Sequence, residues 1–72
     1  QGHITLALAH PDPRVLRMAV AGDGGLTCSG VTHPIAATTA VLEFDVASDA
    51  ATLPFLRLQA NGRCRVYWAE LV

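Results

Sequence analysis

Residues 55–68 read FLRLQANGRCRVYW, and this stretch decides the fold class. Apolar and polar side chains alternate on both sides of Asn61-Gly62, which is the pattern of a strand with one buried face. Asn-Gly between two such runs is the strongest short-range indication of a β-hairpin. The stretch therefore predicts two antiparallel strands joined at Asn61-Gly62.

The register of this hairpin depends on the loop length. A two-residue loop places Leu58 opposite Arg65 and so mixes charge with the apolar face. A three-residue loop over 60–62 pairs Leu58 with Cys64 and turns Trp68 inward, which keeps one face wholly apolar. We therefore expect the three-residue loop, with Arg57 and Arg65 facing outward on neighbouring strands.

The same period of two recurs along the rest of the chain, and no segment has a sustained helical period. Alternating runs are separated by turn residues at 10–13, by the glycine-rich hairpin turn Gly22–Gly25 and by Pro34. The pattern predicts an all-β fold: a small antiparallel β-sandwich, immunoglobulin-like, or a partly open barrel, of about six strands. Residues 1–72 form a single domain on this interpretation.

The inward positions of these runs predict the core. They are Ile4, Leu6, Leu8, Leu16, Met18, Val20, Leu26, Cys28, Leu42, Phe44, Val46, Leu56, Leu58, Cys64, Val66 and Trp68.

Composition excludes several classes of protein. The chain has 72 residues, 51% of them hydrophobic, and a net charge of −1, which argues against disorder and against nucleic acid as a partner. The longest stretch without Asp, Glu, Lys or Arg, 24–42, is broken by Gly, Pro and Thr and is not a membrane span. The chain starts at Gln1, so we expect a fragment or processed chain of a larger soluble protein. The compartment is open, with secreted or periplasmic favoured.

Cys28 and Cys64 are a candidate disulfide, because both fall on inward positions of different strands. Such a bridge would stabilise a small domain by about 3–4 kcal/mol. The alternative is two unlinked thiols in the core, where cysteine behaves as a small hydrophobe. The spacing of the cysteines and of His3, His10 and His33 does not match a metal site.

The outer face of the predicted hairpin is the candidate binding surface. Guanidinium groups match carboxylates and phosphates, and aromatic rings offer flat contact surfaces. The candidate ligand-binding residues are Phe55, Arg57, Arg63, Arg65 and Tyr67. The alternative is an ordinary solvated strand face. No arrangement of nucleophile, acid or base indicates a catalytic site, and no cofactor is expected.

The stretch also resembles the closing hairpin of small immunoglobulin-like accessory domains appended to bacterial hydrolases and phosphoesterases. The matching residues are Phe55, Leu56, Arg57, Leu58, Gly62, Arg63 and Trp68. The chain departs from that pattern after Trp68, where residues 69–72 stay strand-like. The resemblance implies a non-catalytic appendage, and no catalytic residue carries over.

Together these observations favour a non-catalytic binding module that recognises a glycan or a protein surface. The rival hypothesis is a structural or oligomerisation domain that pairs with another chain through an exposed edge strand at 66–72. An enzyme ranks below both.

Overall fold

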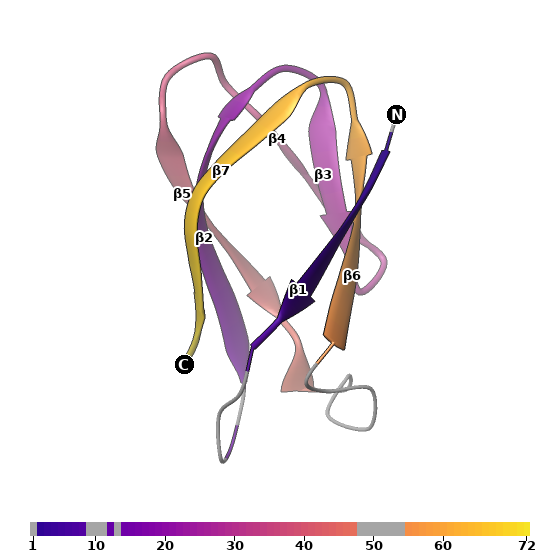
Figure 1. The fold of residues 1–72 in the computed structure, drawn as a ribbon, viewed down its shortest axis with the longest axis vertical. Coiled ribbons are helices and arrows are strands. Elements are labelled where there is room, and N and C mark those ends of the chain that lie inside the picture. Colours follow the sequence, from indigo (N-terminus) through magenta and orange to yellow (C-terminus); the bar gives the residue numbers. More distant parts are fainter. Residues whose placement is uncertain (1, 9–11, 13, 48–54) are drawn as a thin grey trace.

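The computed structural model describes residues 2–8, 12, 14–47 and 55–72, and this part of the chain forms two antiparallel sheets (Figure 1). Sheet A has the strand order β1-β6-β3-β4, and sheet B has the order β5-β2-β7. The strands are β1 (Gly2–Ala7), β2 (Val15–Gly22), β3 (Gly25–Cys28), β4 (Val31–Pro34), β5 (Ala40–Asp45), β6 (Phe55–Asn61) and β7 (Cys64–Leu71). The predicted all-β antiparallel sandwich is confirmed. Of the predicted break at 10–13, only Asp12 lies within the described residues.

The predicted hairpin at Asn61-Gly62 is wrong. β6 pairs with β1 and β3, whereas β7 pairs with β2 in the other sheet. Asn61 and Gly62 therefore carry the chain from sheet A to sheet B, and Gly22–Gly25 carries it from sheet B to sheet A. Alternation could not reveal this, because two amphipathic strands bury their apolar faces equally well across a sandwich or side by side in one sheet.

A two-residue hairpin does occur, at Ser29-Gly30 between β3 and β4. Cys28 is paired with Val31, and both loop residues have positive φ, 51° at Ser29 and 78° at Gly30. This is the backbone that tight hairpins prefer, because its twist matches that of the flanking strands. The alternation does not predict a separate strand here, but residues Val31–Pro34 form β4.

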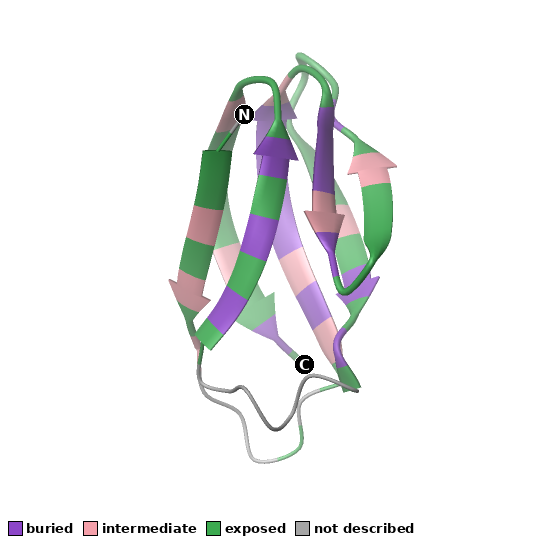
Figure 2. Ribbon diagram, turned by 90° about the vertical axis from the view of Figure 1, so that its right-hand side faces the viewer, coloured by how far each residue is buried: buried purple, intermediate pink, exposed green. Residues whose placement is uncertain are grey.

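The core is close to the predicted one, and Figure 2 shows the buried positions alternating with exposed ones along β6. Of the predicted residues, the fully buried ones are Leu16, Met18, Val20, Leu26, Cys28, Phe44, Val46, Leu56 and Leu58. Those partly buried against them are Ile4, Leu6, Leu8, Leu42, Cys64 and Val66. Ile35, Ala60 and Leu71 are additional core residues.

Trp68 is the exception, because it is 43% exposed and lies on the outer face. β7 pairs Trp68 with Ala19 but Val66 with Val20, so Tyr67 is an extra residue in a β-bulge. The bulge puts two consecutive side chains on the outer face and reverses the alternation beyond it. Leu71 consequently faces the core.

The predicted disulfide is also absent, since Cys28 and Cys64 are both thiols in the structure. Cys64 is paired with Gly22 at the end of the sandwich where the chain crosses between sheets. Cys28 lies three residues beyond Gly25, which pairs with Asn61 at that same end. Three strand residues span about 10 Å, and a disulfide requires Cα atoms within about 7 Å of each other.

One open side of the sandwich is closed by His33 of β4. Its Nε2 lies 3.0 Å from the backbone oxygen of Glu43, and its ring centroid lies 4.7 Å from that of Phe44. These contacts join β4 to β5. His33 is therefore a packing residue between two edge strands.

Candidate ligand-binding face

The predicted binding residues do not share one face. Phe55 and Arg57 lie on the outer face of sheet A, where Arg57 is opposite Thr5 of β1. Arg65 and Tyr67 lie on the outer face of sheet B, where Arg65 is opposite Ala21 of β2. The proposed pairing of Arg57 with Arg65 is thus wrong, because β6 and β7 belong to different sheets.

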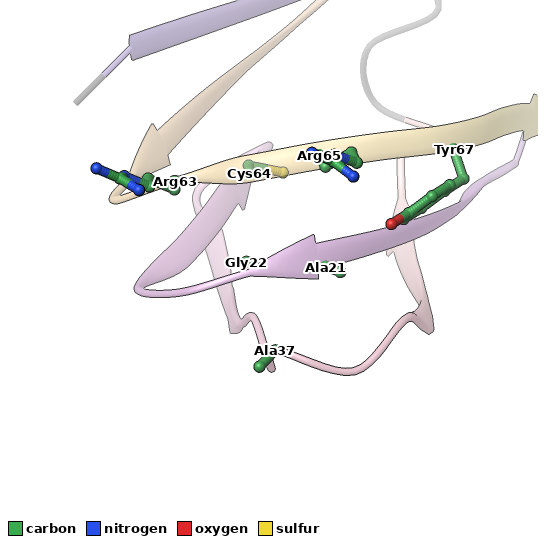
Figure 3. Close-up of a pocket in the computed structure, with 7 residues that line it drawn as sticks. All are labelled: Ala21, Gly22, Ala37, Arg63, Cys64, Arg65 and Tyr67. Carbon is green, nitrogen blue, oxygen red and sulfur yellow. The ribbon is translucent and has the colours of Figure 1, made fainter.

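Arg63, Arg65 and Tyr67 nevertheless surround one hollow of about 350 Å³ on sheet B. Ala21 and Gly22 of β2, Cys64 of β7 and Ala37 of the β4–β5 connection complete its lining (Figure 3). The hollow exists because the central strand carries small side chains on this face. Figure 3 shows the Tyr67 ring extending from β7 towards β2.

Two polar side chains influence the hydroxyl of Tyr67. Hydrogen bonds with the side chains of Arg65 and Thr39 lower the pKa of its hydroxyl, although the ring is exposed to solvent. Thr39 precedes β5, so the tyrosine spans the outer face from one edge of sheet B towards the other. The hydroxyl therefore has polar neighbours on the outer face of sheet B.

The bulge places Trp68 beside Tyr67 in the chain and on the same outer face. In the register, Trp68 and Val41 flank Ala19 of the central strand. Ala19 is almost fully buried, while Val41 is 48% and Trp68 43% exposed. Trp68 is a site residue that the sequence analysis missed, because uninterrupted alternation assigned it to the core.

The arginines of sheet B differ in whether a carboxylate lies beside them. Arg17 lies between two carboxylates: its Nη1 donates a hydrogen bond to Glu70 Oε1 at 3.2 Å. Its Nε lies 3.0 Å from Glu43 Oε2 as an ion pair whose geometry is not that of a hydrogen bond. Within the described residues, Arg63 and Arg65 have no carboxylate at ion-pair distance. No carboxylate of the described residues therefore neutralises these two guanidinium groups.

The remaining chemistry of the hollow is limited. Burial raises the pKa of the Cys64 thiol, which disfavours the reactive thiolate. In the part of the chain that the structure describes, no three His, Cys, Asp or Glu side chains are placed to hold a metal ion. The described residues contain no helix that could span a membrane.

Comparison with protein families, with curated proteins and with solved structures finds no match to this chain.

Proposed function

We propose that this domain is a non-catalytic binding module whose ligand contacts the outer face of sheet B. The observation that carries the proposal is the grouping of Arg63, Arg65 and Tyr67 around one hollow, with Trp68 on the same face. Two of the exposed large apolar side chains of the molecule, Tyr67 and Trp68, are therefore adjacent there. Exposed aromatic residues next to arginines are typical of contact surfaces.

The chemistry of the hollow favours an acidic glycan as the ligand. A guanidinium group binds a carboxylate through two parallel hydrogen bonds. An exposed aromatic side chain offers an apolar face together with a polar edge, which suits the mixed surface of a sugar ring. A protein surface with acidic side chains is the other ligand class that the same groups could hold.

We also propose that this binding module is an accessory domain of a larger hydrolase. Its support is the two-sheet antiparallel architecture and the matching residues of β6 and β7. The closing hairpin of such domains is not part of that support, because β6 and β7 are not paired with each other.

A glycan array with neutral, uronate-containing and sulfated oligosaccharides tests the proposal. We expect binding of acidic glycans that is lost in Arg65→Ala and Tyr67→Ala. Phe55→Ala and Arg57→Ala are matched controls, because they remove the same residue types from the opposite face and should leave binding intact.

Loss of binding in the controls alone would move the site to sheet A and overturn the assignment. Absence of any glycan signal for the wild-type chain would overturn the glycan as ligand class.

A further inference from the structure

Among the residues that the structure describes, β1, β4, β5 and β7 each have one edge without a strand partner. Such an edge is a template for another strand, and natural proteins usually protect it with short length, proline, charge or a bulge. β4 has four residues and ends at Pro34. β5 carries Glu43 and Asp45, and β7 has the bulge at Tyr67 as well as arginine and glutamate side chains.

β1 has none of these protections. Its residues, Gly2–Ala7, include no proline and no Asp, Glu, Lys or Arg. Its pairing with β6 runs without a shift from Gly2 opposite Ala60 to Ala7 opposite Phe55. β1 is therefore a regular, uncharged edge strand, which favours strand addition.

There is also room for an added strand beside β1. Sheet A has four strands and sheet B has three, and β1 is the last strand of the wider sheet. Figure 2 shows β1 at the border of sheet A. Ile4 and Leu6 of β1, and Leu8 just after it, face inward and are only half-buried.

We propose that β1 pairs antiparallel with β1 of a second copy of this chain, around a two-fold axis at Thr5. Thr5 then faces Thr5 of the second copy, and Ile4 faces Leu6. This register keeps the apolar side chains of both copies on the same, inward face of the extended sheet. The two threonines form a favourable cross-strand pair on the outer face.

A second copy fits this edge better than the edge of β7 does. The bulge at Tyr67 would interrupt a ladder between two copies of β7, and β7 also carries Arg65 and Glu70. Pairing of β1 with β1 extends sheet A by a regular strand. The uncharged strand also brings no like charges together at the axis, and the resulting two-fold interface is of the commonest type.

One pair of strands makes a small interface, so the dimer is expected to be weak and concentration-dependent. Sedimentation equilibrium should show the mass rising from 7.6 kDa to twice that value and no further. Thr5→Glu should raise the dissociation constant at least about tenfold, because two carboxylates would face each other at the axis. The Thr5→Glu variant should keep its fold, because Arg57 lies opposite position 5 in the same chain and carries the opposite charge.

Thr32→Glu is the matched control, since it places the same charge on the outer face of β4, the other edge of sheet A. It should leave the dissociation constant unchanged. A monomer at every soluble concentration, or a dimer that Thr5→Glu does not weaken, would overturn the proposal.

Cross-linking tests the register separately. In a Cys64→Ser background, Thr5→Cys should form a disulfide-linked dimer on mild oxidation, because directly opposed residues have Cβ atoms about 4.5–5.5 Å apart. His3→Cys should link much less, since His3 faces Ala7 of the second copy. Equal linking of both variants, or faster linking of His3→Cys, would contradict the pairing about Thr5.

Discussion

Asp23 and Arg63 lie forty positions apart in the chain and exchange two hydrogen bonds. The backbone N–H of Arg63 donates to Asp23 Oδ1 at 2.7 Å, and the backbone N–H of Asp23 donates to the Arg63 carbonyl at 2.9 Å. Asp23 belongs to the crossing from β2 to β3, and Arg63 to the crossing from β6 to β7. The two crossings are thereby joined at one end of the sandwich.

We expect Asp23→Ala to lower the free energy of unfolding by about 1–2 kcal/mol, because it removes a hydrogen bond to a backbone N–H. Asp23→Asn should cost less, since its amide oxygen can still accept. The control is Asp45→Ala, which removes a local bond to the Ala47 N–H two residues away. Urea unfolding curves measure the differences. An equal loss in Asp23→Asn and Asp23→Ala would show that the accepting oxygen is not what matters.

Gly24, at the crossing, and Gly30, in the β3–β4 hairpin, have the same kind of backbone conformation but different surroundings. Gly24 and Gly30 have similar positive φ, 72° and 78°. A Cβ at Gly24 would overlap the carbonyl oxygen of Asn61, whereas a Cβ at Gly30 would have no atom within 4 Å. Gly30→Ala should therefore cost about 1–2 kcal/mol from conformation alone. Gly24→Ala should cost more than about 4 kcal/mol, or prevent folding.

Thermal unfolding of both variants checks this prediction. Equal melting temperatures for the two would mean that the crossings do not pack as closely as the structure has them.

The sequence was sufficient to predict strands and most of the core, because the period of two is local. Leu56 and Leu58 alternate with outward residues whichever strand lies beside them, so their burial could be predicted without knowing the topology. Pairing is a long-range property. Asn61-Gly62 suits any sharp reversal of the chain, and here the reversal crosses the core rather than continuing one sheet. The tight hairpin lies instead at Ser29-Gly30, whose residues also indicate a turn.

The candidate site shows the same division between local and long-range information. Arg65 and Tyr67 were identified from their outward positions, which alternation predicts. Their separation from Phe55 and Arg57 follows from the crossing at 61–62, which alternation cannot show. Uninterrupted alternation places Trp68 in the core. The bulge that turns it outward depends on how β7 pairs with β2, which the sequence does not show.

The exposure of Trp68 can be tested directly, since it is the single tryptophan of the chain. Trp68→Ala should lower the free energy of unfolding by about 1 kcal/mol, because the side chain is 43% exposed. Phe44→Ala should cost about 3–5 kcal/mol, because Phe44 is fully buried in the core. Acrylamide should quench the native fluorescence nearly as well as that of the unfolded chain. A strongly protected, blue-shifted emission would instead place Trp68 in the core.

The two thiols should differ in reactivity. Cys64 is partly accessible, but its raised pKa slows its reaction with a thiol reagent near neutral pH. Cys28 is buried in the core and should react only when the protein unfolds. Thiol titration without reductant should therefore find one slow site in the native protein and two sites in urea. Fewer than two reactive thiols in urea would indicate a disulfide.

The last prediction concerns the hydroxyl of Tyr67, the single tyrosine of the chain. Hydrogen bonds with Arg65 and Thr39 lower its pKa in the folded protein. The resulting stabilisation is fully present above the pKa of the unfolded chain and is lost as the pH falls through the folded pKa, so it contributes nothing at neutral pH. Arg65→Gln should raise the midpoint of the ultraviolet phenolate titration and lower stability only at alkaline pH. Arg57→Gln, on the opposite face, should shift neither, and an equal shift in both variants would point to net charge rather than to the Arg65 contact.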